Sequence, residues 1–100
     1  MARFLVTYHV GAMAQDRESV ATARDEFAHW ARTAGMRIAD LGTPVRSTTT
    51  LTRDGVNAAP QGELLGWSVI EGADDEEAAR IMQYHPFIGR GGVVRISAPV

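Results

Sequence analysis

Residues 81–92, IMQYHPFIGRGG, place a histidine directly before a proline. Histidine is the side chain whose ordinary pKa best suits proton transfer near neutral pH. Pro86 disfavours helical backbone geometry at His85, so we expect a helix to end there. The apolar face of that helix is predicted to be Ala78, Ile81 and Met82, and His85 is the next position on it, so we expect its ring to be directed toward the sheet. The helix dipole favours the protonated imidazole and burial favours the neutral form, and a ring balanced between them suits acid–base catalysis. The alternative is a C-terminal cap whose ring binds the last carbonyl groups of the helix.

Asp40 is the second candidate for catalysis, because it lies in the otherwise apolar segment IADL, residues 38–41. A buried carboxylate requires a partner or a cavity, since an unpaired buried charge is strongly destabilising. Asp40 would either orient a catalytic histidine or act as a base. The alternative is an ion pair with an arginine, such as Arg37, Arg46 or Arg95.

Aromatic and polar side chains of the predicted sheet and first helix are candidates for binding a small organic molecule. They are Tyr8, Trp30, Trp67, Ser68 and Arg95. A tryptophan at core spacing is otherwise part of the core, and Arg95 would bind a carboxylate or pair with Glu71. We expect a pocket between sheet and helices, lined by Asp40, Trp67 and His85.

The composition excludes several kinds of chemistry. The 100 residues include no cysteine and no lysine, which removes thiolate nucleophiles, thiolate metal sites and Schiff-base lysines. Three scattered histidines lack the spacing of a structural zinc site, and GRGG at 89–92 is interpreted as a turn instead of a dinucleotide fingerprint. We therefore expect neither a metal nor a cofactor.

Charge and hydropathy bear on partners and location. A net charge of −2 without a basic block gives no indication of nucleic-acid binding. The longest apolar run is far shorter than the roughly 18 residues of a membrane span. The start, MARFLVTYH, is interpreted as a strand instead of a signal peptide, so we expect a cytoplasmic protein without a membrane partner.

Hydrophobic periodicity predicts a single domain over residues 1–100 with the order β-α-β-β-α-β. The expected strands and helices are, in chain order, strand 3–9, helix 17–34, strand 36–42, strand 64–71, helix 74–85 and strand 92–97. Asp74 and Glu77 have the spacing of a capping box at the start of the second helix. The polar segment 46–63 is expected to form a small β-excursion or a mobile loop, with Asp54–Gly55 as a hairpin signal.

This element order predicts a ferredoxin-like α+β fold, in which two helices cover one face of a four-stranded antiparallel sheet. The other face then carries apolar side chains without a covering helix. Two such faces packed together would bury both, so we expect a homodimer of the dimeric α+β-barrel type. Val94 in the last strand is expected at that interface.

Short motifs are distributed over nearly the whole chain. They are FAHWARTAG (27–35), IADLGTPV (38–45), DG (54–55), GWSVIEGADDEEAARIM (66–82) and HPFIGRGGVVRI (85–96). In combination they resemble the YCII-related family, specifically its DGPF-like branch. The resemblance implies a dimeric ferredoxin-like fold and an enzymatic role that involves a histidine and an aspartate.

Two departures from the family pattern limit what this resemblance implies. The histidine early in the first helix of the short YCII branch is matched here by Arg24, with His29 further on. RDGVNAAPQGE stands in place of the DGPFAETKE signature. A related branch is similar to muconolactone dehalogenases, but that chemistry does not carry over residue by residue.

Three functions follow as hypotheses. The first is a small-molecule acid–base enzyme, a lyase, isomerase or hydrolase, which requires His85 and Asp40 in one open cavity. The second is a non-catalytic small-molecule-binding or interaction module, which requires a pocket without a paired acid and base. The third is a cofactor-free oxygenase of the dimeric α+β-barrel class, which requires a drier and more aromatic pocket.

Overall fold

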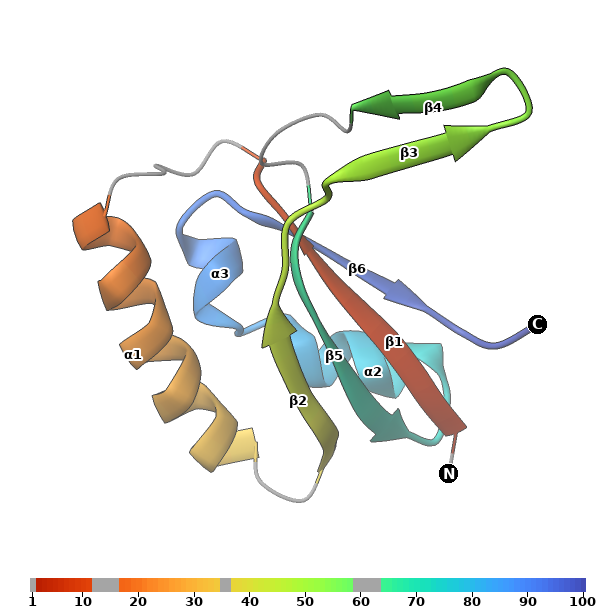
Figure 1. Cartoon of the computed structure of the whole chain (residues 1–100). Helices are drawn as coiled ribbons and strands as arrows, with labels where there is room; N and C mark the ends of the chain where they lie inside the picture. The colour runs from red at the N-terminus through yellow and green to blue at the C-terminus, as the bar shows by residue number, and fades with distance from the viewer. Residues whose placement is uncertain (1, 12–16, 35–36, 59–63) are drawn as a thin grey trace.

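The computed structural model describes residues 2–11, 17–34, 37–58 and 64–100, which form a mixed α+β fold (Figure 1). Its elements are, in order, β1 (Ala2–His9), α1 (Arg17–Ala34), β2 (Ile38–Pro44), β3 (Thr49–Thr52), β4 (Gly55–Ala58), β5 (Leu64–Gly72), α2 (Asp75–Met82), α3 (Pro86–Gly89) and β6 (Val93–Ser97). Met36, in the predicted second strand, lies outside the described residues. None of the described helices is long and apolar enough to cross a membrane.

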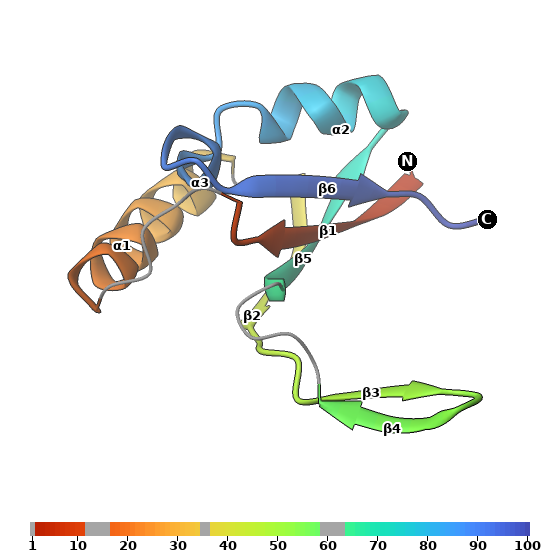
Figure 2. The same cartoon turned by 90° about the horizontal axis from the view of Figure 1, so that it is seen from above.

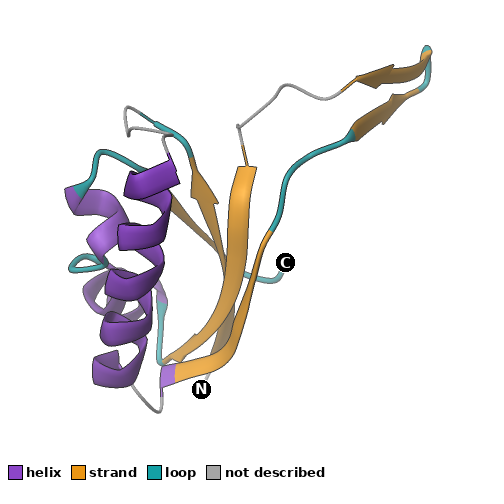
Figure 3. Cartoon of the chain, turned by 60° about the vertical axis from the view of Figure 1, so that its left-hand side comes forward, coloured by secondary structure: helices purple, strands orange, loops and turns teal. Residues whose placement is uncertain are grey.

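Four strands form an antiparallel sheet in the order β2-β5-β1-β6, with β1 and β5 in the centre. The helices gather on one side of this sheet, as Figure 3 shows. This arrangement confirms the predicted α+β class and is compatible with a ferredoxin-like fold. Helix α3 is an addition to the predicted order, because the chain resumes helical geometry directly after His85.

Side chains alternate between the two faces of the sheet, as strand geometry requires. On the helix-covered face the sheet contributes Phe4, Val6, Tyr8, Ser68 and Ile70, all buried. Ala78 and Met82 of α2 pack onto this core, which confirms the predicted buried face of that helix. The hydrophobic core therefore lies between the sheet and the helices.

The opposite side of the sheet is the open face, which the described helices leave uncovered (Figure 3). Its residues face one another across β5, β1 and β6 and are Leu5, Thr7, His9, Trp67, Val69, Val93 and Arg95. Leu5 and Val93 are 45% and 47% exposed. The prediction that Val94 lies on this face is wrong, because its side chain packs against the core.

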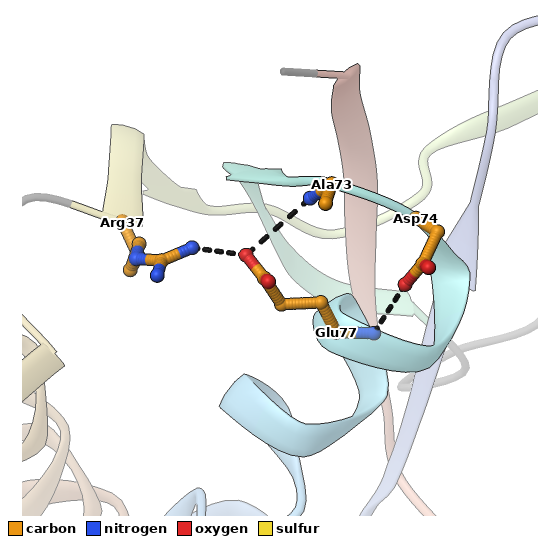
Figure 4. A network of polar contacts seen from close by, with 4 residues as sticks. All are labelled: Arg37, Ala73, Asp74 and Glu77. Atoms are coloured by element: carbon orange, nitrogen blue, oxygen red, sulfur yellow. Dashed lines mark hydrogen bonds and ion pairs between the residues drawn. The ribbon is translucent and has the colours of Figure 1, made fainter.

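A capping network fixes the start of α2 (Figure 4). The backbone N–H of Glu77 donates to Asp74 Oδ1 at 2.8 Å, which confirms the predicted helix start. The Glu77 carboxylate accepts from the N–H of Ala73, one residue before the position that a capping box uses, and it binds the guanidinium of Arg37. The ion pair ties the start of α2 to the segment that enters β2.

Strands β3 and β4 form a separate two-stranded hairpin that projects away from the four-stranded sheet (Figures 1 and 2). Thr52 pairs with Gly55 across a tight turn at Arg53 and Asp54, so the Asp54–Gly55 hairpin signal is confirmed. Leu51 and Val56 pair across the hairpin and are 74% and 70% exposed.

Candidate functional site

His85 lies in the break between α2 and α3. Its backbone N–H donates to the carbonyl of Met82 at 3.0 Å, and its extended backbone (φ −60°, ψ 133°) ends the path of α2. Imidazole Nδ1 accepts the N–H of Phe87 at 3.0 Å. The prediction that His85 caps the C-terminus of α2 is therefore wrong, because its side chain caps the N-terminus of α3 instead.

The imidazole of His85 is 2% exposed and packs among aromatic rings. Its ring centroid lies 4.5 Å from that of Trp30, 4.8 Å from Phe27, 5.1 Å from Tyr8 and 6.3 Å from Phe87. Burial lowers the pKa of His85 from 6.5 to about 4, because this apolar environment disfavours the charged form. The expected balance near neutrality does not hold, and the ring is neutral at physiological pH.

The hydrogen bond at Nδ1 defines the tautomer of His85. A neutral imidazole that accepts at Nδ1 carries its proton on Nε2, so the second nitrogen is a donor. Nε2 is buried and has no hydrogen-bond partner among the described residues. The neighbouring rings offer an N–H group only weak N–H···π contacts. The site therefore contains a buried donor that an oxygen acceptor would satisfy.

An open groove of about 480 Å³ lies beside this histidine. The groove is lined by Asp25, Glu26, His29, Trp30, Tyr84 and Pro86. Trp30 contacts the imidazole directly, while Tyr84 and Pro86 flank His85 in the chain. The imidazole therefore does not line the groove itself, but it contacts one of the side chains that do.

Arg90 connects the two sides of this groove. Its Nε and Nη2 atoms donate to the two carboxylate oxygens of Glu26 at 3.1 and 3.0 Å, which joins the end of α3 to α1. This bidentate bond holds the pKa of Glu26 below its ordinary value. Arg90 compensates the charge of Glu26. The acidic character of the groove therefore comes from its second carboxylate, that of Asp25.

Asp40 lies in a different part of the fold from His85 and makes no hydrogen bond to it. It is exposed on the edge strand β2, so the expectation of a buried carboxylate is wrong. Its Oδ1 accepts the N–H of Gly42 at 2.9 Å, while Arg37, one of its predicted partners, binds Glu77. The structure does not join Asp40 to His85, whose Nδ1 is engaged by Phe87 and whose Nε2 is unpartnered among the described residues.

We predict that Asp40 acts through this local turn. Asp40→Asn keeps the oxygen that accepts from Gly42, so its free energy of unfolding should equal that of the parent within about 0.5 kcal/mol. Asp40→Ala removes the acceptor and should cost about 1 kcal/mol. Urea denaturation measures both, and an equal loss in the two variants would instead indicate that the negative charge matters.

Tyr8 and Ser68 form a buried chain of hydrogen bonds across the sheet. The hydroxyl of Tyr8 donates to Ser68 Oγ at 2.9 Å, and Ser68 donates to the carbonyl of Leu41 at 2.7 Å. Burial raises the pKa of Tyr8, and the bond to Ser68 opposes that shift only in part. Of the two, Tyr8 also contacts His85, whereas Ser68 binds β1 and β2 to β5.

Trp67 and Arg95, the other predicted ligand contacts, lie on the open face. Both stand opposite Thr7 in their strand pairs, on the side of the sheet away from His85. The alternative pairing of Arg95 with Glu71 is not observed, and Oε1 of Glu71 instead lies 3.7 Å from Nε of Arg3. The three residues of the predicted pocket therefore lie apart. His85 is on the helix-covered side of the sheet, Trp67 is on the open face, and Asp40 is on the edge strand β2.

Sequence reasoning omitted Phe27, Phe87, Asp25 and Tyr84 from the site. Phe27 and Trp30 are three residues apart on α1, a spacing that places both on one helix face and could have revealed the pair. Phe87 follows His85 by two residues, and its role depends on α3, which the sequence pattern did not indicate. The side chain of Arg24, noted in the family comparison, lies outside the described part of the structure.

Comparisons with known proteins add no assignment to this geometry. Neither the protein-family models nor the curated proteins give a match to the chain. Within the described residues, no three histidine, aspartate or glutamate side chains gather in a way that would hold a metal ion. The groove and the buried His85 are therefore the features of this protein that indicate a function.

Proposed function

We propose that the protein is a small-molecule-binding module whose site is the groove between α1 and the α2–α3 break. Trp30 and Tyr84 supply apolar ring surface for a flat ligand. The Nε2–H of His85 donates to an oxygen of that ligand when the Trp30 ring moves aside. The observation that supports this most directly is the buried Nε2, which lacks a hydrogen-bond partner among the described residues.

The same geometry favours binding over acid–base catalysis. A general base requires a free lone pair, but Nδ1 of His85 already accepts from Phe87 and Nε2 carries the proton. No hydrogen bond joins the ring to Asp40, which binds the N–H of Gly42. A pocket without a paired acid and base is what the binding hypothesis requires. In it, a neutral imidazole serves as a fixed donor.

A matched pair of probes tests this role. Benzaldehyde and styrene have similar size and shape, but only benzaldehyde has an oxygen acceptor. We expect benzaldehyde to bind more tightly than styrene and to shift the ¹⁵N–¹H signal of His85 Nε2 in NMR titrations. His85→Asn keeps an oxygen to cap Phe87, but its shorter side chain carries its N–H donors short of the position of Nε2, so the preference for benzaldehyde should be lost.

His9→Gln serves as the control, because His9 is on the open face with Nε2 2.9 Å from Thr7 Oγ1. This variant should retain the preference for benzaldehyde. Equal affinity of the parent protein for both probes, or a preference that persists in His85→Asn, would reject His85 as the ligand donor.

A cofactor-free oxygenase is the second candidate function. The observation that favours it is the set of aromatic rings around the buried imidazole, which makes a dry environment. Such an enzyme would consume oxygen when supplied with an electron-rich phenol. Oxygen-electrode measurements with and without hydroquinone, corrected for autoxidation, would distinguish this candidate from a binding module.

We further propose that the protein is a cytoplasmic homodimer of the YCII-related type, in its DGPF-like branch. The motifs at 27–35, 38–45 and 85–96 support the family proposal. The apolar side chains of the open face, among them Leu5, Val69 and Val93, support pairing of two sheets face to face. Sedimentation analysis of the full chain at micromolar concentration tests the dimer directly.

A further inference from the structure

The β3–β4 hairpin lacks the packing that such a structure ordinarily needs. Two strands alone are at best marginally stable in water, and these strands pair with each other instead of joining the four-stranded sheet. Leu51 and Val56 form a cross-strand pair on one side of the hairpin and are 74% and 70% exposed. Large aliphatic side chains gathered on a projecting element indicate a surface that another chain covers.

The open face is the surface on which a second copy of the chain would pack. Four strands spaced about 4.8 Å apart and about seven residues long present a projected area of about 440 Å². The accessible surface of this face is larger than its projection, because side chains stand out from the sheet. The open face is therefore broad enough to form the centre of an interface between two copies.

The hairpin lies where it would extend such an interface. Two strands of four residues have a projected face of about 130 Å². The hairpin projects on the side of the sheet away from the helices, which is the side of the open face (Figure 3). In a two-fold dimer that pairs the open faces, each hairpin would therefore lie beside the partner subunit, and its apolar pair would find a partner of the same kind of chemistry.

We propose that the β3–β4 hairpin is a dimerisation arm that packs Leu51 and Val56 against a second copy of the chain. The inference rests on the proposed homodimer and names the segment that completes its interface. The apolar pair lies on one side of the arm, whereas Thr50 and Thr52 alternate to the other side. Only the first side is expected to be covered.

A matched pair of variants tests the arm. Leu51→Asp and Thr50→Asp place the same charge at neighbouring exposed positions of β3, on opposite sides of the hairpin. In sedimentation equilibrium we expect Leu51→Asp to raise the dimer dissociation constant by at least about 30-fold. Thr50→Asp should leave it within about threefold of the parent value. Circular dichroism should show the same folded core in both variants, because the arm lies outside the main sheet.

A paramagnetic label shows whether the contact is between subunits. The chain has no cysteine, so Asp54→Cys provides a unique attachment point at the tip of the hairpin. Mixing labelled ¹⁴N chains with unlabelled ¹⁵N chains should broaden signals of the unlabelled subunit. A dimer with no such broadening, and with equal dissociation constants for Leu51→Asp and Thr50→Asp, would overturn the arm alone. A parent protein that sediments as a monomer would overturn the homodimer itself, and the arm with it.

Discussion

The folded state is expected to lose about 3 kcal/mol of stability through His85 as the pH falls from about 7 to about 4. Burial lowers the pKa of this imidazole from 6.5 to about 4. Between these values the unfolded chain binds a proton that the folded chain does not bind. Acid therefore favours the unfolded state, and the loss is complete once the pH has fallen below the folded pKa.

The same proton has a local structural consequence. Nδ1 of His85 accepts from the N–H of Phe87 only while it retains a lone pair. Protonation converts Nδ1 into a donor and removes the cap of α3. We therefore expect α3 and the ring of Phe87 to be among the first parts of the described fold to lose their packing in acid.

His85→Phe isolates this contribution, because phenylalanine fills a similar space among the rings and does not titrate. Urea denaturation of the parent and the variant from pH 4 to pH 7 gives two stability curves. Their difference should change by about 3 kcal/mol over that range. His9→Gln, which alters the open face, should follow the parent curve. Parallel curves for the parent and His85→Phe would contradict the lowered pKa.

Local spacing in the sequence predicted much of the fold. Asp74 and Glu77 identified the start of α2, and helical spacing identified Ala78 and Met82 as its buried face. These features depend on neighbours in the chain and on helical periodicity, both of which a sequence shows directly. The hairpin was likewise predicted from a local signal, the neighbouring residues Asp54 and Gly55.

The candidate site was predicted only in part, because it depends on contacts between distant segments. The rings of Phe27 and Trp30 on α1 reach His85 only after α1 has packed across the sheet. Burial of His85 followed from its position after Met82, but the resulting pKa depends on how completely those rings exclude water. The expectation that Asp40 is buried was wrong for a similar reason, because an apolar sequence context does not show that β2 is an edge strand.

Replacing Gly42 by alanine should cost at least about 3 kcal/mol and loosen β2 from β5. Gly42 has a φ of +74°, a left-handed conformation that destabilises residues with a Cβ atom by about 1–2 kcal/mol. A Cβ atom there would lie 1.8 Å from the carbonyl oxygen of Trp67, far inside contact distance. The backbone must move to relieve this clash, and Leu41, whose carbonyl accepts from Ser68, is the adjacent residue.

Gly89→Ala is the matched control, because a Cβ atom at Gly89 in α3 meets nothing within 4 Å. Its free energy of unfolding should stay within about 0.5 kcal/mol of the parent value. Hydrogen exchange of Gly42→Ala should show lost amide protection along β2 and β5, whereas Gly89→Ala should show none there. Equal stability of the two variants would contradict the close approach of Gly42 to Trp67. A large loss at Gly42, together with a loss in Asp40→Ala and parental stability of Asp40→Asn, would show that residues 40–42 hold the edge of the sheet and that the oxygen of Asp40 contributes through its bond to Gly42.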